Sequence, residues 1–396
     1  MNKNQIGKNL SYVRHFNQGL VLKKLLIHGP SSRNELSMSL GLTKMTITNI
    51  VTDLLDHNIV SEEICNPVGS ACRKIGIISL NSDVLYAIGV HVSHSNVCCS
   101  IADITGNLLE RCETILNAKT TRQTLTSTIT THIQYFLQKY NDRLIVGIGV
   151  ASIGLVDSKH GSVLSSTNFY DIFDWNIGQE LTAKFSLPVY VTNDMKAAAL
   201  AEYYYGSKRR FSSFVYMGIS DGKSLAAAKQ TIGAGIIAND ELFEGGDGYN
   251  GSVGHMSINR DGPLCPCGNK GCLELYTSVP SALNISGCKT WKDFLQLFEA
   301  VELPPVAERF LDDLSIGLTS LVNIFNPEAI FIGHSGAYLN NYCFERLRIS
   351  VNASSLIRSV HKVEVLPSSL SERIGYLSAI APIFSRLLSG EISLPQ

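Results

Sequence analysis

The stretch Gly254–Glu274, GHMSINRDGPLCPCGNKGCLE, places one histidine and three cysteines within eighteen positions. These four residues follow the spacing H-x9-C-x-C-x4-C, and the glycines among them allow the tight turns that a four-point chelate needs. Three thiolates and one imidazole suit tetrahedral Zn²⁺, and a complete set of four ligands leaves no position for an activated water. The stretch therefore predicts one structural zinc per chain, bound by His255, Cys265, Cys267 and Cys272. The alternative is a group of reduced thiols beside a core histidine.

The composition of the 396 residues, 45% hydrophobic and 17% charged, is typical of a globular chain with two or three domains. No run of eighteen apolar residues occurs, and the polar N-terminus has no apolar segment after it. These features argue against a membrane span or a signal peptide, so we expect a cytoplasmic protein. Ten cysteines are too sparse for a secreted disulfide scaffold and fit reduced thiols with one metal cluster.

The net charge of −1 conceals an asymmetry along the chain. Residues 1–82 carry nine Lys or Arg against five Asp or Glu, a net +4, which leaves −5 for the remainder. A small basic segment on an acidic body favours nucleic acid as a partner.

Residues 31–60, SSRNELSMSLGLTKMTITNIVTDLLDHNIV, predict two short helices joined by a turn. Ser32 and Glu35 form a capping box, Gly41 ends the first helix, and Thr43 caps the second. An apolar helix that stops at Gly29 precedes them. Two β-prone runs around a turn at 67–70 then predict a hairpin wing, and together these elements make a winged helix-turn-helix. A helical hairpin used for dimerisation is the alternative.

The polar face of the second short helix suits a DNA major groove. We expect DNA contacts from this face and from two basic residues of the wing, for which plain solvated charge is the alternative. The predicted DNA-contacting residues are Lys44, Thr46, Thr48, Asn49, Thr52, Arg73 and Lys74.

From Leu80 onward the pattern changes to alternating strands and helices in two successive series. The first series reads β, β, α, β and ends in LPVYVTND and an alanine-rich helix, and the second surrounds the cysteine-rich stretch. Two α/β lobes with a cleft between them are therefore expected.

The cysteine-rich stretch resembles the zinc motif of the ROK family of sugar-responsive repressors and bacterial sugar kinases. The resemblance covers nearly the whole chain: residues 31–60 are similar to the DNA-binding segment of the repressor branch, which includes N-acetylglucosamine and xylose repressors. Residues 187–202, LPVYVTNDMKAAALAE, are similar to the sugar-site segment. The resemblance implies an α/β body with two lobes of the actin and hexokinase (ribonuclease H-like) type, preceded by the winged helix-turn-helix. The expected domains are residues 1–80, 81–196 and 197–396, with a C-terminal helix that can return to the first lobe.

The resemblance further implies a sugar site formed by Asn193, Asp194, His255 and Glu274, with Gly154 at a turn beside it. Capping of the following helix is the alternative role of the Asn-Asp pair, and both roles are compatible. Ser252 stands where the family has a glutamate that contacts sugar hydroxyls. The family phosphate loop, Asp-x-Gly-Gly-Thr, would fall near Gly89, but its aspartate, second glycine and threonine are missing, and the second loop looks interrupted. An ATP site is therefore not expected.

These observations predict a transcriptional repressor, not an enzyme, that binds operator DNA and releases it when a sugar or sugar phosphate binds the body. A homodimer or homotetramer is expected, because one helix-turn-helix reads only a half-site. Two alternatives stay open: a regulator controlled by a protein partner, with a vestigial sugar pocket, and an ATP-dependent sugar kinase.

Overall fold

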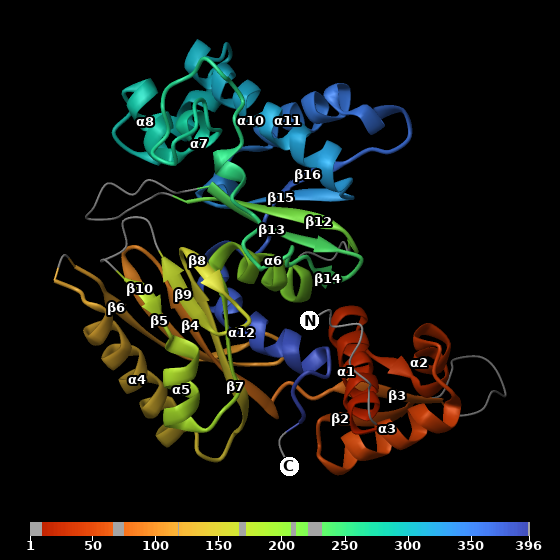
Figure 1. Ribbon diagram of the computed structural model, residues 1–396. Coiled ribbons are helices and arrows are strands. Elements are labelled where there is room, and N and C mark those ends of the chain that lie inside the picture. Colours follow the sequence, from red (N-terminus) through yellow and green to blue (C-terminus); the bar gives the residue numbers. More distant parts are fainter. Residues whose placement is uncertain are drawn as a thin grey trace.

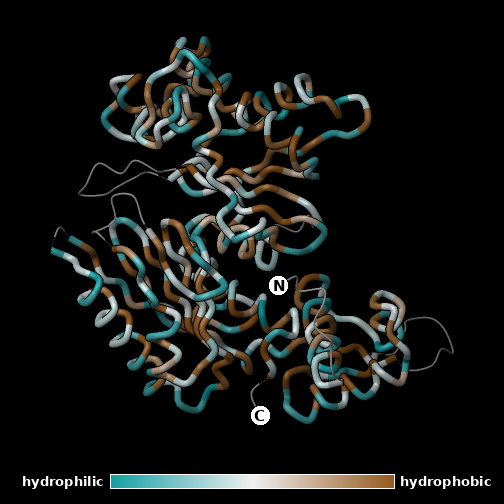
Figure 2. The backbone as a smooth tube through the Cα atoms, viewed as in Figure 1, coloured by the Kyte–Doolittle hydropathy of each residue, from teal (hydrophilic) through white to brown (hydrophobic). Residues whose placement is uncertain are grey.

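The computed structural model describes residues 10–65, 75–117, 119–165, 172–206, 211–220 and 232–394. Figure 1 shows a small N-terminal head beside a body of two stacked lobes. Figure 2 shows hydrophobic segments running through the strands of the body, where the buried apolar residues gather. No helix within these ranges is long and apolar enough to cross a membrane.

The head consists of three helices and a three-stranded sheet with the order β1-β3-β2. The predicted caps are confirmed: Ser32 and Glu35 form the capping box, Gly41 takes the left-handed conformation, and the Thr43 side chain accepts a hydrogen bond from the Thr46 amide. The elements are α1 (Leu10–His28), β1 (Ser31–Ser32), α2 (Arg33–Leu40), α3 (Lys44–Asp56), β2 (Val60–Cys65) and β3 (Ile75–Leu80). The strands β2 and β3 are antiparallel, as a wing requires, while the turn predicted at 67–70 lies outside the described residues.

The first lobe has a five-stranded sheet with the order β11-β7-β4-β5-β6 and a small three-stranded sheet with the order β10-β9-β8. Helices α4 (Arg122–Lys139) and α5 (Ile177–Phe185) belong to this lobe (Figure 1). Its strands are β4 (Leu85–Val92), β5 (Asn96–Asp103), β6 (Leu108–Ile115), β7 (Leu144–Ser152), β8 (Leu155–Asp157), β9 (Ser162–Ser165), β10 (Phe173–Trp175) and β11 (Val189–Asn193).

The second lobe repeats this plan with a five-stranded sheet of order β14-β13-β12-β15-β16. Its strands are β12 (Phe214–Ile219), β13 (Ile232–Ala238), β14 (Glu241–Leu242), β15 (Ala329–His334) and β16 (Glu364–Pro367). Its helices are α7 (Glu274–Thr277), α8 (Val279–Ser286), α9 (Trp291–Gln296), α10 (Pro305–Phe325) and α11 (Asn341–Ser354). In both lobes the first strand pairs antiparallel with the second and parallel with the fourth, so the two-lobed α/β fold expected from the resemblance is confirmed.

Two helices lie between the sheets and connect the lobes. Helix α6 (Asp194–Tyr205) follows the last strand of the first lobe and packs on β12 and β13 of the second. Helix α12 (Ile374–Leu388) follows the last strand of the second lobe and packs on β4 and β7 of the first. A Cβ atom at Gly149 of β7 would lie 2.1 Å from the carbonyl oxygen of Ala379, so only glycine admits α12 this close to the sheet. The expected domain boundary at 196/197 falls inside α6.

The head meets the body mainly along α1, which packs against α12. A Cβ atom at Gly19 of α1 would lie 2.4 Å from the carbonyl oxygen of Leu388, at the end of α12. The side chain of Lys23 donates a hydrogen bond to the carbonyl oxygen of Asp240 at 2.9 Å and lies 5.0 Å from the ring centroid of Tyr203. One helix of the head thus contacts both helices that lie between the sheets.

Candidate functional site

The predicted histidine and cysteines come together after the short helix Val253–His255, and their four ligand atoms lie within 4.8 Å of one another. Two edges of this group, Cys265 Sγ to His255 Nδ1 and Cys267 Sγ to Cys272 Sγ, are both 3.6 Å long. A tetrahedron with Zn–S bonds of about 2.3 Å has edges of about 3.7 Å, so the cluster already has the size of a zinc site. Cys265 and Cys272 are buried while Cys267 is exposed. The four residues could hold a metal such as zinc.

The predicted sugar ligand Glu274 is the first residue of α7 and lies directly behind this cluster. Its Oε1 atom is 3.3 Å from His255 Nδ1 and 3.5 Å from Cys265 Sγ, and its side chain is buried. Glu274 does not line the cavity between the lobes, whereas His255 does. The carboxylate of Glu274 contacts the same Nδ1 atom of His255 that faces Cys265, so Glu274 lies directly against the cluster.

A cavity of about 280 Å³ lies between the two lobes. It brings together four of the predicted sugar-site residues, which arrive from separate elements: Gly154 before β8, Asn193 and Asp194 at the start of α6, and His255 beside the cysteines. Ser252, which stands in place of the family glutamate, lines the same cavity.

The structure shows that Asn193 has a capping role. Its Oδ1 accepts hydrogen bonds from the amides of Met195 and Lys196, and its Nδ2 donates one to the carbonyl oxygen of Gly154 at 3.1 Å. These contacts place Asp194 in the wall of the cavity, where burial raises the pKa of its carboxyl to about 7. Asp194 is thus a carboxyl group that changes charge near neutral pH.

Other cavity residues were not predicted. His94, Ser220, Tyr249 and Asn250 also line the cavity, the last two from a glycine-rich loop that precedes the cysteine cluster. Lys196 holds this loop, because its buried side chain donates hydrogen bonds to Glu244 Oε2 at 3.2 Å and to the carbonyl oxygen of Gly248 at 2.5 Å. The signal in the sequence was the density of polar residues among glycines at 245–254.

Among the described residues that line this cavity, Asp194 is the only Asp or Glu and there is no Lys or Arg. Burial lowers the pKa of His94, so this imidazole is neutral at pH 7. The remaining polar groups are the imidazole of His255, amides, hydroxyls and backbone atoms. The described lining therefore offers hydrogen-bond partners for a ligand with several hydroxyl groups.

The predicted DNA face lies on α3 of the head. Its apolar side is buried by Ile47, Ile50, Val51 and Leu54, which leaves the opposite side free. The side chains of Lys44, Thr48, Asn49 and Thr52 are exposed and that of Thr46 is half-buried. Arg33 donates hydrogen bonds to both carboxylate oxygens of Glu62 in β2 and so ties α2 to the wing. The predicted contacts Arg73 and Lys74 lie outside the described residues.

Comparison with known proteins agrees with this architecture. Residues 87–382 match the ROK family. The xylose repressor of Bacillus spizizenii is 29% identical over 387 residues, which cover 96% of this chain and 97% of that protein. A ROK family transcriptional regulator described as a homologue of the Escherichia coli Mlc protein superposes with a TM-score of 0.76 at 23% identity, covering 96% of this chain and 98% of that one. A ROK hexokinase of Thermus thermophilus superposes with a TM-score of 0.62 at 22% identity and covers 76% of this chain and 97% of its own.

Proposed function

The chain belongs to the ROK family, and on that premise we propose that it is a cytoplasmic transcriptional repressor that binds operator DNA through its head and releases it when a neutral sugar enters the cavity between the lobes. One observation carries the regulatory role. The similarity to the xylose repressor spans the head as well as the body, whereas the hexokinase matches only about three quarters of the chain.

The proposed DNA contacts are direct base readout by the exposed face of α3 and phosphate contacts by its N-terminal end and by the wing. Thr48 and Asn49 are placed to face base edges, and Lys44, Arg73 and Lys74 supply positive charge for phosphates. A homodimer or homotetramer would present two heads to two half-sites, which is the general requirement for this type of reader.

The proposed effector is an unphosphorylated sugar of the size of a pentose or hexose. Support comes from the lack of Lys and Arg among the described lining residues, since a buried phosphate needs a compensating cation. Asp194 would accept hydrogen bonds from sugar hydroxyls, with His255 and Asn250 beside it. The serine at 252 removes the second carboxylate, which favours a ligand with fewer hydroxyls to satisfy. The first ligand to test is D-xylose, because similar proteins are xylose repressors.

We also propose that the His/Cys cluster holds one structural zinc per chain, bound by His255, Cys265, Cys267 and Cys272. The zinc would fix the loop that carries His255 and Ser252 at the mouth of the cavity. The metal would have no catalytic part, because four protein ligands complete its coordination.

Signal transfer from the cavity to the head would run through α6 and α12. Asp194 begins α6 at the cavity, and Tyr203 near its other end lies against Lys23 of the head. A sugar that draws the lobes together changes the position of α6 relative to α12, and α1 contacts both helices. The sugar can change operator affinity only by the factor by which the protein's sugar affinity differs between the two positions of α6 relative to α12. This factor is typically about 5 to 150.

The experiment begins with selection of an operator from random DNA by the full-length protein. Fluorescence anisotropy then measures operator affinity with D-xylose, D-glucose and D-xylose 5-phosphate in turn. We expect a neutral sugar to weaken binding at least fivefold and the phosphate to have no effect. Failure to select any DNA sequence would contradict the repressor assignment. Release by no sugar would instead favour the alternative in which a protein partner controls the regulator.

A further inference from the structure

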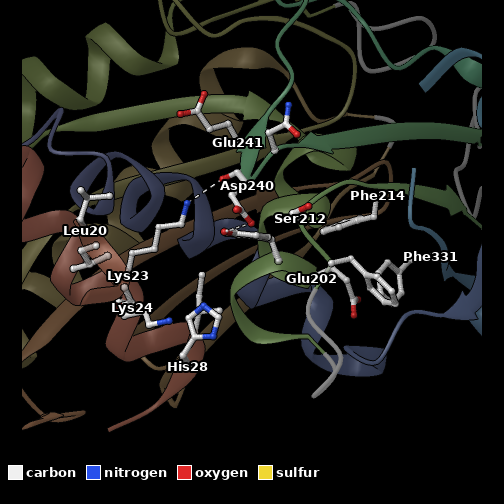
Figure 3. A pocket seen from close by; sticks show the side chains of 16 residues that line it. Leu20, Lys23, Lys24, His28, Glu202, Ser212, Phe214, Asp240, Glu241 and Phe331 are labelled. Carbon is white, nitrogen blue, oxygen red and sulfur yellow. Dashed lines mark hydrogen bonds between the residues drawn. The ribbon is translucent and has the colours of Figure 1, made fainter. Parts of the chain in front are cut away.

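A second and larger cavity, of about 520 Å³, lies where the head meets the body (Figure 3). One wall comes from α1 and the end of α2, and the other comes from α6, the start of β12 and β15. It shares no lining residue with the cavity between the lobes. Its volume falls within the usual range of small-molecule sites, about 300 to 1,000 Å³.

The body side of this cavity is aromatic and rigid. Phe331 makes edge-to-face contacts with Phe211 and Phe214, at centroid distances of 5.9 and 5.2 Å. Phe214 and Phe331 are buried in the core, so their rings are held in place from behind. Leu20 and Ile27 of α1 add aliphatic surface from the head. These walls suit a flat apolar group.

The charged groups of this cavity are mostly paired with one another. Lys23 donates a hydrogen bond to the carbonyl oxygen of Asp240. Burial lowers the pKa of its ammonium group, and the nearby carboxylates of Asp240 and Glu241 oppose this shift. Asp240 accepts a hydrogen bond from the Tyr203 hydroxyl at 3.0 Å. Glu202 accepts hydrogen bonds from the hydroxyls of Ser368 and Ser369. Asp240 and Glu202 therefore already have protein partners, while Glu241 is exposed.

Lys24 differs from Lys23, Asp240 and Glu202, which line the same cavity. Its ammonium group forms no hydrogen bond or ion pair with any residue that the structure describes. Figure 3 shows it on α1 beside His28, one helical turn further on, with the rings of Phe214 and Phe331 across the cavity. An uncompensated cation opposite a cluster of rings is complementary to an anion that has an aromatic body.

We propose that this cavity is a second small-molecule site, which binds an aromatic organic anion with its charged group at Lys24 and its ring against Phe211 and Phe331. This site is separate from the sugar cavity and does not rest on the function proposed for it. Because its two walls belong to the head and to the body, a bound anion holds the head in the described arrangement. Helix α6 borders the sugar cavity at Asp194 and this site at Tyr203, so the two ligands would influence each other's binding.

The test uses the full-length protein and three probes with the same ring system: naphthalene-1-sulfonate, 1-naphthylmethanol and 1-naphthylmethylamine. Isothermal titration calorimetry measures their binding to the wild type and to Lys24→Met, Lys24→Glu and Lys362→Glu. Lys362 is exposed on the second lobe and is not among the residues that line the cavity, so it serves as the charge-matched control. Thermal melts without probe show whether each variant is folded.

We expect the sulfonate to bind once per chain and more tightly than the alcohol or the amine. Lys24→Met should weaken sulfonate binding about tenfold, because one charge-assisted hydrogen bond is lost. Lys24→Glu should abolish it, and Lys362→Glu should leave it unchanged. Equal binding of the three probes would overturn the proposal, and so would unchanged sulfonate affinity in a folded Lys24→Glu variant. A third contradicting result is one-to-one displacement of the sulfonate by every sugar that binds at Asp194, with no displacement in Asp194→Asn.

Discussion

Replacing Gly19 with alanine tests the packing of the head against α12. The added Cβ atom would lie 2.4 Å from the carbonyl oxygen of Leu388 and 2.8 Å from its carbonyl carbon. Ordinary contacts of a Cβ atom begin at 3.4 Å, so α1 must move away from α12 by about 1.0 Å. The obstacle is a backbone carbonyl near the end of a packed helix, which cannot rotate away as a side chain would.

Two opposing contributions set the size of the effect. Overpacking of this kind costs about 1 to 3 kcal/mol. Alanine in place of glycine inside a helix stabilises the helix by about 1 kcal/mol, because alanine has the higher helix propensity. We therefore expect Gly19→Ala to weaken the contact between head and body by up to about 2 kcal/mol. Operator affinity should change as well, because the head shifts relative to the body.

Gly375 in the first turn of α12 provides the matched control, since a Cβ atom built there meets nothing within 4 Å. Differential scanning fluorimetry of the two variants, followed by operator titration, gives the comparison. Gly375→Ala should equal or exceed the wild type in melting temperature, and Gly19→Ala should fall below both. Equal melting temperatures and equal operator affinities for the two variants would show that the close approach of α1 to α12 is not a constraint in solution.

Three further results are expected. Cys267→Ser should lower both the zinc content measured by elemental analysis and the melting temperature, because an incomplete tetrahedron releases the loop that carries His255. The control Cys288→Ser, outside the cluster, should change neither quantity. A wild-type protein without zinc would contradict this prediction. Sugar affinity should fall about tenfold between pH 8 and pH 6, because burial raises the pKa of Asp194 to about 7 and its carboxylate accepts stronger hydrogen bonds from hydroxyls than the protonated acid does. Calorimetry should find this pH dependence absent in Asp194→Asn. Asn49→Ala should cost about 1 to 3 kcal/mol on the selected operator and little on random DNA, whereas Lys44→Ala should weaken both alike and reduce the log–log salt slope by about 0.9; the reverse pattern would exchange the two roles.

Local signals in the sequence predicted the head and the cluster well. The caps at Ser32 and Thr43 and the glycine at 41 act within one turn of chain, so their effects can be read from neighbouring residues. The four metal-binding candidates lie within eighteen positions, and their ligand atoms come together as the spacing predicted.

Features that depend on long-range packing were missed. Strand β6 was not predicted, because it is an edge strand whose residues are largely exposed and whose charged positions resemble a loop. Lys196 looked like an ordinary residue of an alanine-rich helix, and only the fold reveals that it is buried and holds Gly248. The cavity beside Lys24 combines residues more than three hundred positions apart, from Leu20 to Phe331, so no local pattern could indicate it.

The place of α12 has a consequence for how the protein is made. The head is encoded first, and α2, α3, β2 and β3 pack on one another, so these elements can fold while the ribosome is still translating the body. The first lobe cannot, because the face of its sheet formed by β4 and β7 stays uncovered until residues 374–388 emerge at the end of synthesis. A chain cut short before α12 would expose that apolar face and be open to aggregation and proteolysis, even where the elements of its head had already folded.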